Sequence, residues 1–154
     1  MSALLDNLPV YRRMANADLD TVMAIENVIY PLPWTHGNFS DSLAAGYQCL
    51  VLELAGEIAG YCVIAIAAGE AHLLNLSVAA RWQRRGLGRE MLEFLLKLAR
   101  DHTAHKVYLE VRPSNLAALR LYASAGFRGI AIRRGYYPGP TGSEDAVVME
   151  LVFE

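Results

Sequence analysis

Apolar and polar positions follow two different periods along this chain, and each period predicts one kind of element. In residues 106–112, KVYLEVR, Val107, Leu109 and Val111 alternate with other side chains, which predicts a strand with one buried face. Residues 87–100 carry apolar side chains three and four positions apart, which predicts a helix. The same reasoning predicts further strands at 9–14, 47–54, 57–68, 72–78, 128–134 and 146–153, and helices that begin at Asn16 or Asp18, at Thr35, and at Ser114 or Asn115.

The order of these elements predicts the fold class. Ala55-Gly56 is a connection short enough for an antiparallel hairpin, whereas the strand at 72–78, the helix at 87–100 and the strand at 106–112 form one β-α-β crossover. We therefore expect an α/β fold with a mixed, mostly antiparallel central sheet flanked by helices. We expect residues 1–154 to form a single domain, and the Gly/Pro-rich segment 135–143 to be a functional or mobile loop.

Composition excludes several classes of protein. The chain is 54% hydrophobic with a net charge of −2, which is typical of a globular domain and does not suggest a general nucleic-acid binder. The longest uncharged run, 58–69, is shorter than the roughly 18 residues of a membrane span, and the N-terminal residues show no export signal. Cys49 and Cys62 are expected to be buried free thiols, which fits the cytoplasm. The four histidines are scattered, so we expect surface or packing roles and no metal site.

The segment QRRGLG, residues 83–88, lies between a predicted strand and a predicted helix. A helix N-terminus offers unpaired N–H groups and partial positive charge, and glycines let a ligand approach that backbone closely. Nearby arginines add charge for phosphate oxygens. The residues expected to hold a compact polyanion are Gln83, Arg84, Arg85, Gly86, Leu87, Gly88 and Arg89, with Arg81 close by.

Other interpretations of this segment stay open on the residues alone. A tight strand-to-helix connection with solvated arginines is equally typical of such a sequence. A mononucleotide P-loop is disfavoured because no GKS or GKT follows, and a dinucleotide fingerprint lacks its third glycine.

Two ordered motifs resemble the GNAT family of N-acetyltransferases. The family's acetyl-coenzyme A motif, Q/R-x-x-G-x-G/A, is matched by Gln83, Gly86 and Gly88. A second family segment is matched by NLAALRLYASAGF, residues 115–127. The segments YPLPWT, LEVRPSN, RRGYYP and EDAVVM are similar to the bacterial RimI branch, which acetylates the N-terminal alanine of a small-subunit ribosomal protein. The sequence departs from this branch at Pro113 and Gly135. These differences concern the conformation of loops more than the chemistry of the site.

The resemblance implies roles for two residues. Glu110 matches the general base, acting directly or through one water, and Tyr122 matches the general acid that protonates the leaving sulfur. A glutamate with a pKa of about 4.3 accepts a proton poorly from an ammonium of about 8. The role of Glu110 therefore requires a raised pKa, a relayed proton or rapid proton loss to solvent, and Arg112 would oppose a raised pKa if it lay close. Alternatively, Glu110 faces water and Tyr122 packs in the core.

Further residues are expected around the cofactor and the acceptor amine. Backbone N–H groups near Leu76 to Val78 are expected to polarise the thioester carbonyl, and Asn115 resembles the residue that contacts the pantetheine arm, although it also suits a helix cap. Trp34, exposed at the end of its loop, and the pair Tyr136 and Tyr137 are expected to frame a peptide's first residues, unless they only pack within loops.

An α-amino group is partly unprotonated near neutrality, whereas lysine, with a pKa of about 10.4, is not, so one glutamate suits an N-terminal amine better. The sequence therefore predicts a cytoplasmic acetyl-CoA-dependent N-acetyltransferase that acts on the N-terminus of a ribosomal protein or another peptide. Two alternatives remain. One is an acetyltransferase for a small-molecule amine or lysine, and the other is a non-catalytic coenzyme A-binding or ribosome-assembly module.

Overall fold

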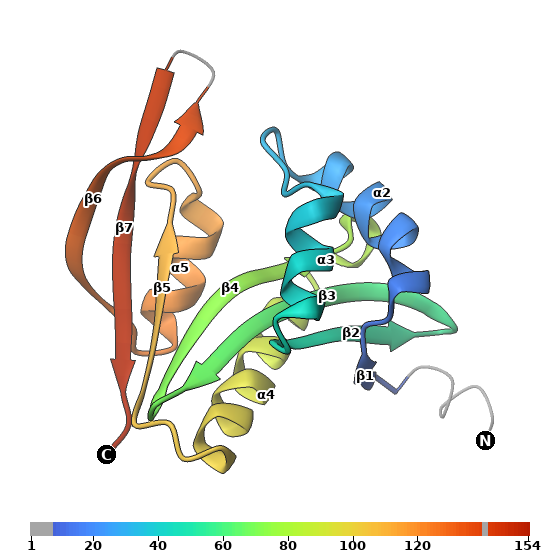
Figure 1. The fold of residues 1–154 in the computed structure, drawn as a ribbon, viewed down its shortest axis with the longest axis horizontal. Coiled ribbons are helices and arrows are strands. Elements are labelled where there is room, and N and C mark those ends of the chain that lie inside the picture. The colour runs from blue at the N-terminus through green and yellow to red at the C-terminus, as the bar shows by residue number, and fades with distance from the viewer. Residues whose placement is uncertain (1–7, 140–141) are drawn as a thin grey trace. The chain divides into compact units, whose positions relative to one another are not determined.

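The computed structural model describes residues 8–139 and 142–154, and Figure 1 shows their succession of helices and strands. Most elements begin and end within a few residues of the positions that the hydrophobic pattern predicts. The elements are β1 (Val10–Arg13), the 3-10 helix η1 (Asn16–Asp18), α2 (Leu19–Ile29), α3 (His36–Ala44), β2 (Gln48–Leu54), β3 (Glu57–Ala67), β4 (Glu70–Val78), the 3-10 helix η2 (Ala80–Trp82), α4 (Leu87–Asp101), β5 (Lys106–Val111), α5 (Leu116–Ser124), β6 (Arg128–Gly139) and β7 (Gly142–Val152).

The strands pair in the order β1-β2-β3-β4-β5-β7-β6. β4 and β5, which are connected through α4, pair in parallel, with Glu70, Ala71 and His72 opposite Lys106, Val107 and Tyr108. The pairs β1–β2, β2–β3, β5–β7 and β6–β7 are antiparallel. This pairing confirms the predicted mixed, mostly antiparallel sheet with one β-α-β crossover.

The described residues divide into two compact units. The first comprises residues up to Ile64 together with Asn75–Met91, and the second comprises Ala65–Leu74 together with Leu92–Glu154. That the whole chain folds as a single domain stays a prediction.

The first unit is built on the β2–β3 hairpin. Ala55 and Gly56, with φ of 54° and 78°, form the two-residue turn that the sequence predicts. A Cβ on Gly60 would lie 2.8 Å from both the Ser77 carbonyl oxygen and Met91 Sδ, so β3 tolerates no side chain where Ser77 and Met91 pack against it. The largest fully buried apolar side chains of this unit are Tyr61, Phe39, Leu19, Leu52, Ile64, Met91, Val22 and Val51.

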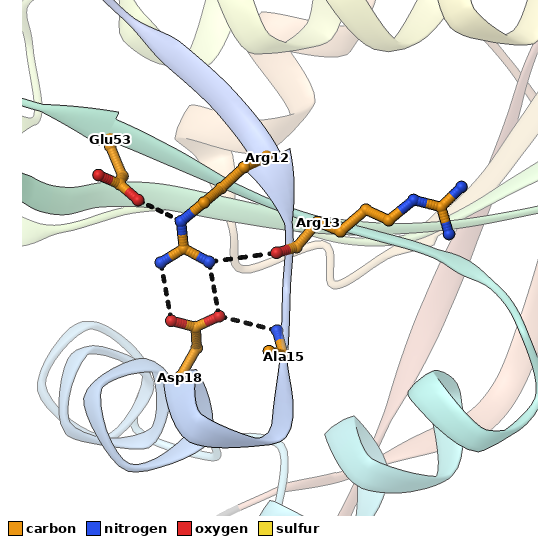
Figure 2. A network of polar contacts seen from close by, with 5 residues as sticks. All are labelled: Arg12, Arg13, Ala15, Asp18 and Glu53. Atoms are coloured by element: carbon orange, nitrogen blue, oxygen red, sulfur yellow. Dashed lines mark hydrogen bonds and ion pairs between the residues drawn. The ribbon is translucent and has the colours of Figure 1, made fainter.

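An arginine on β1 organises the start of α2 (Figure 2). The Arg12 guanidinium donates two 2.8 Å hydrogen bonds to the two carboxylate oxygens of Asp18 and a third to Glu53 on β2. Asp18 Oδ2 also accepts the Ala15 N–H at 2.7 Å. The Asp18 side chain therefore closes η1 and makes no cap bond to α2, which corrects the expectation that Asn16 or Asp18 caps this helix.

The second unit contains the predicted alternation of β5. Val107, Leu109 and Val111 are buried, and Tyr108 and Glu110 lie on the opposite face of the strand. β7 pairs with β5 along its length, and Figure 1 shows β6 and β7 as a long hairpin beside it.

The segment 135–143 was expected to be a loop, and its described residues contradict this. Residues 135–139 continue β6 and residues 142–143 begin β7, with Tyr137 opposite Glu144 and Pro138 opposite Ser143. The register is irregular between Arg133 and Tyr137, and Asp145 Oδ1 accepts the Gly135 N–H at 2.8 Å, so the left-handed Gly135 is accommodated as a bulge. Pro138 is tolerated because β6 is an edge strand. Residues 140–141 lie outside the described residues.

Both cysteines are free and buried, as predicted. Burial raises the pKa of the Cys49 thiol to about 11 and that of the Cys62 thiol to about 12, so both are protonated and unreactive near neutrality. Over residues 8–139 and 142–154, no helix combines the length and apolar character that crossing a membrane requires.

Candidate active site

The predicted polyanion site lies in the first unit, where α4 begins. Gly86 precedes the helix, and its carbonyl oxygen accepts the Glu90 N–H at 3.1 Å. The N–H groups of Leu87 and Gly88 are thus in the first helical turn, where no carbonyl of the helix can accept from them. Gly86 has a φ of +83°, and a Cβ placed on it would meet no heavy atom within 4 Å. Glycine is therefore needed here for its backbone conformation, and the space where its side chain would lie is open.

We call the turn before α4, residues 83–88, the glycine joint. The side chain of Gln83 connects this joint to the preceding strand, β4. Gln83 Nε2 donates to the Val78 carbonyl oxygen at 2.9 Å, which fixes the turn between β4 and α4. Arg84 has a φ of 62°, so this turn contains a second left-handed residue, and its side chain is exposed. The half-buried Leu76 and Val78 are near the end of β4, as the sequence predicts.

Trp82 is a residue that the sequence analysis missed. Its Nε1 donates to Glu57 Oε1 at 2.9 Å, and the Arg81 and Arg85 guanidinium carbons lie 5.0 and 5.2 Å from its ring centre. Arg81 also forms an ion pair with Glu57 at 3.0 Å. Two of the arginines near the predicted phosphate site therefore lie over one indole ring.

A buried carboxylate holds the loop that follows α2. Glu26 is 1% exposed, and its oxygens accept the Trp34 N–H at 2.9 Å and the Tyr61 hydroxyl at 2.6 Å. Burial raises the pKa of Glu26, although these hydrogen bonds act in the opposite direction. The Trp34 ring packs 5.0 Å from Phe39 and is half-buried, so the expectation of an exposed Trp34 is wrong.

Tyr30, from the same loop, reaches the end of β4. Its hydroxyl lies 2.7 Å from Ser77 Oγ and 3.3 Å from the Leu76 carbonyl oxygen. Ser77 in turn donates to Asn75 Oδ1 at 2.6 Å. In the first unit, these contacts join the loop that carries Trp34 to the strand residues expected beside the thioester.

In the second unit, Glu110 is enclosed by two partners from other strands. Its side chain is 8% exposed, and Oε2 lies 2.5 Å from His72 Nε2 on β4, while Oε1 accepts from Arg133 Nη1 on β6 at 3.3 Å. Burial acts to raise the pKa of Glu110, but the contacts with His72 and Arg133 outweigh it and lower the pKa below its ordinary value. A lowered pKa is the opposite of the first of the three conditions for Glu110 to act as a base, so a relayed proton or rapid proton loss to solvent is the condition that fits this site.

The His72 ring stacks on Tyr108, in agreement with the expected packing role, and its Nε2 also contacts Glu110. Arg112, the expected charged neighbour of Glu110, is directed elsewhere. It donates to the Pro138 carbonyl oxygen at 2.7 Å and to Glu144 Oε1 at 3.1 Å, and it stacks on the Tyr137 ring. Hydrogen bonds from Ser114 and Arg112 hold the pKa of Glu144 below its ordinary value.

α5 carries the predicted general acid. Asn115 precedes the helix, and its side chain accepts the Ala118 N–H at 3.2 Å, so its capping role is confirmed. Tyr122 lies in the helix, is 8% exposed, and its ring packs 5.6 Å from Phe127. The core-packing interpretation of Tyr122 is thus satisfied, and its role as an acid stays a prediction.

Tyr136 and Tyr137 lie on β6 of the second unit, with ring centres 4.8 Å apart. Arg133 stacks on Tyr136 and Arg112 on Tyr137, each at 4.3 to 4.4 Å. Burial raises the pKa of Tyr137 well above its ordinary value. Each of the two tyrosine rings therefore packs against the guanidinium group of an arginine. Among the described residues, no group of three or more His, Cys, Asp or Glu side chains is arranged to hold a metal ion.

Comparison with known proteins identifies the family. The model of the acetyltransferase (GNAT) family matches residues 19–127. The chain belongs to this family. It is 36% identical over 138 residues to the ribosomal protein bS18-alanine N-acetyltransferase of Escherichia coli K12, covering 90% of this chain and 93% of that protein. The crystal structure of the Escherichia coli ribosomal-protein-S18-alanine N-acetyltransferase has a TM-score of 0.87 at 34% identity, covering 96% of this chain and 95% of that chain. The crystal structure of Ard1 from Thermoplasma volcanium has a TM-score of 0.85 at 26% identity, over 95% and 98% of the two chains.

Membership of the GNAT family confirms that the protein is an acetyl-CoA-dependent N-acetyltransferase. The joint before α4 fits the cofactor. It has the N–H groups of Leu87 and Gly88 in the first helical turn, the glycine Gly86 with no heavy atom near its missing side chain, and the exposed cation Arg84.

Proposed function

We propose that this GNAT protein acetylates the N-terminal α-amino group of a ribosomal protein that begins with alanine, and that it does so in the cytoplasm. The observation that carries the proposal is the 36% identity to the bS18-alanine N-acetyltransferase over 93% of that protein. A likeness of this extent supports a shared substrate class as well as a shared fold.

The residues of the glycine joint hold the cofactor in this proposal. The N–H groups of Leu87 and Gly88 and the side chain of Arg84 bind the pyrophosphate, while Gln83 keeps the turn in shape through its bond to Val78. Backbone N–H groups from Leu76 to Val78 orient the acyl carbonyl, and Asn115 contacts the pantetheine arm. Acetyl-CoA supplies the thioester that the amine attacks.

Glu110 is the proposed general base. It takes a proton from the substrate ammonium, so that the nitrogen lone pair becomes available for attack. The lowered pKa of Glu110 makes it a weak acceptor, and an α-amino group, the least basic of the protein amines, is the substrate that it can deprotonate most readily. This favours an N-terminal amine over a lysine side chain.

Tyr122 is the proposed general acid and donates its hydroxyl proton to the departing sulfur. A phenol with a pKa of about 10 and a thiol with a pKa of about 8.5 differ little, so this transfer costs about 2 kcal/mol before the site contributes. Trp34, Tyr136 and Tyr137 are proposed to contact the first residues of the peptide.

A peptide panel with labelled acetyl-CoA tests the proposed substrate. Peptides that begin with alanine are expected to be acetylated on the α-amine, whereas the same peptides with a blocked N-terminus and an internal lysine are not. Preferential labelling of lysine or of small amines would instead favour the first alternative. Binding of acetyl-CoA without transfer to any amine would favour a non-catalytic module.

The variant Glu110→Gln tests the proposed base. We expect kcat to fall by about a hundredfold or more, because the amide cannot accept the proton. Glu70→Gln, which changes a half-exposed glutamate paired with Lys106, is the matched control and should retain full activity. Unchanged turnover in Glu110→Gln would remove Glu110 from the mechanism.

A further inference from the structure

Glu26 contacts the loop between α2 and α3 at both of its ends. We call residues 30–34 the double-proline loop. The main-chain carbonyl oxygen of Glu26 accepts the Tyr30 N–H at 3.1 Å, where α2 ends. Its side-chain Oε2 accepts the Trp34 N–H at 2.9 Å, shortly before α3 begins. One buried residue therefore binds the first and the last residue of this loop.

The double-proline loop has few other main-chain donors. Pro31 and Pro33 have no N–H group. Leu32, which lies between them, is 39% exposed, and its N–H has no partner among residues 8–139 and 142–154. The bond from the Trp34 N–H to Glu26 is therefore what ties the part of the loop after Tyr30 to the interior.

The Glu26 carboxylate is itself held in one orientation. Its residue is 1% exposed, and Oε1 accepts the Tyr61 hydroxyl of β3 at 2.6 Å, so Oε2 is the oxygen that faces the loop. A buried carboxylate costs folding free energy that an apolar side chain of similar size would not. A requirement for the Trp34 bond accounts for the presence of an acidic residue at this buried position.

We propose that Glu26 is a positioning residue for the acceptor peptide, because it holds the double-proline loop in the conformation that receives the first residues of that peptide. The inference rests on the proposed function, in which Trp34 contacts the peptide. Glu26 is buried beneath the loop and acts through the Trp34 N–H. Its loss should weaken peptide binding and leave acetyl-CoA binding and the chemical step nearly unchanged.

The variant Glu26→Met tests this role, because methionine has a similar shape and accepts no strong hydrogen bond. At saturating acetyl-CoA we expect the KM of a peptide that begins with alanine to rise about fivefold or more, while kcat stays within about twofold of wild type. Calorimetry should give an unchanged Kd for acetyl-CoA.

Two further variants separate the loop contact from core packing. In Glu26→Gln the amide oxygen can still accept the Trp34 N–H and the amide nitrogen can donate to the Tyr61 hydroxyl, so the peptide KM should stay within about twofold of wild type. Tyr61→Phe removes the other bond of the carboxylate and leaves the Trp34 bond in place. We expect it to lower stability in urea unfolding, because Oε1 loses its partner, without raising the peptide KM.

Amide hydrogen exchange reports on the bond directly and does not depend on activity. In ¹⁵N-labelled wild-type protein without peptide, we expect the Trp34 N–H to exchange at least about a hundredfold more slowly than in an unfolded chain. Protection should persist in Glu26→Gln and Tyr61→Phe and be lost in Glu26→Met. The wild-type measurement keeps the inference testable even if Glu26→Met does not fold.

The outcomes distinguish this inference from the proposed function. If wild type acetylates alanine peptides and folded Glu26→Met has the wild-type KM, only the inference is overturned. It is also overturned if Tyr61→Phe or Glu26→Gln raises KM as much as Glu26→Met, or if the wild-type Trp34 N–H is unprotected. If wild type binds acetyl-CoA but acetylates no α-amine, the proposed function fails, and the role of Glu26 in peptide binding fails with it.

Discussion

Gly86 shows how one residue serves both the fold and the cofactor site. Its φ of +83° is in the left-handed region, which other residues adopt only with strain. The absence of any heavy atom within 4 Å of a Cβ at this position means that the strain would come from the backbone alone. The same position lies directly before the N–H groups that are proposed to bind pyrophosphate.

We expect Gly86→Ala to lower the free energy of unfolding by about 1 kcal/mol, because alanine resists a positive φ. For a chain of this length the melting temperature should fall by about 2 to 4 °C, measured by calorimetry. Gly37→Ala, in the first turn of α3, is the control, and it should be neutral or stabilising because alanine favours a helix. An unchanged melting temperature for Gly86→Ala would show that the turn does not need glycine.

At the scale of elements, α3 begins where the double-proline loop ends. Thr35 accepts the Asn38 N–H at 3.1 Å, and Asn38 Oδ1 accepts the Thr35 N–H at 2.9 Å, so the two residues cap the helix reciprocally. Trp34, the preceding residue, is fixed by Glu26 and Phe39. The cap therefore also sets the position of the loop that is proposed to meet the peptide.

Thr35→Ala should destabilise the protein by about 1 kcal/mol, since it removes the cap of α3. Denaturant unfolding measures this loss. Ser40→Ala removes an exposed hydroxyl that bonds within the same helix, to Gly37, and its effect should stay within about 0.5 kcal/mol. Equal effects of the two variants would contradict the capping role of Thr35.

At the scale of the whole molecule, charge pairing links stability to pH. Asp18 in the first unit, and Glu110 and Glu144 in the second, each have a pKa held below its ordinary value by hydrogen bonds or nearby cations. A carboxyl group whose pKa is lowered by folding stabilises the protein above the unfolded pKa of about 4. That contribution is lost as the pH falls through the lower pKa of the folded state.

We expect the free energy of unfolding to be nearly constant from pH 7 to about 5 and to fall below about pH 4. Asp18→Asn should reduce this fall, because the amide has no charge to lose, and should lower stability at pH 7 by about 1 kcal/mol. Urea unfolding at a series of pH values gives both quantities. Asp41→Asn, an exposed position on α3, should leave the acid limb in place, and an Asp18→Asn curve parallel to wild type would refute the assignment.

The sequence by itself determined the type and order of the elements, because each period of apolar residues is a local property of the chain. It placed Glu110 on the strand face opposite Val107, Leu109 and Val111, and Gly86 at a strand-to-helix turn. The two motifs also led to the correct family and cofactor. Periodicity failed where burial depends on partners, since Val28 on α2 is 74% exposed while Glu26 on the same helix is buried.

Only the tertiary structure decided which residues meet. His72 and Glu110 are 38 residues apart in the chain, Tyr61 and Glu26 are 35 apart, and Arg12 and Glu53 are 41 apart. No local pattern specifies such pairs, because they follow from strand register and helix packing. The extension of β6 and β7 through a segment rich in glycine and proline depends likewise on the bond from Gly135 to Asp145 across the hairpin. Local periodicity selects elements, whereas long-range register brings ionisable groups together and so sets their chemistry.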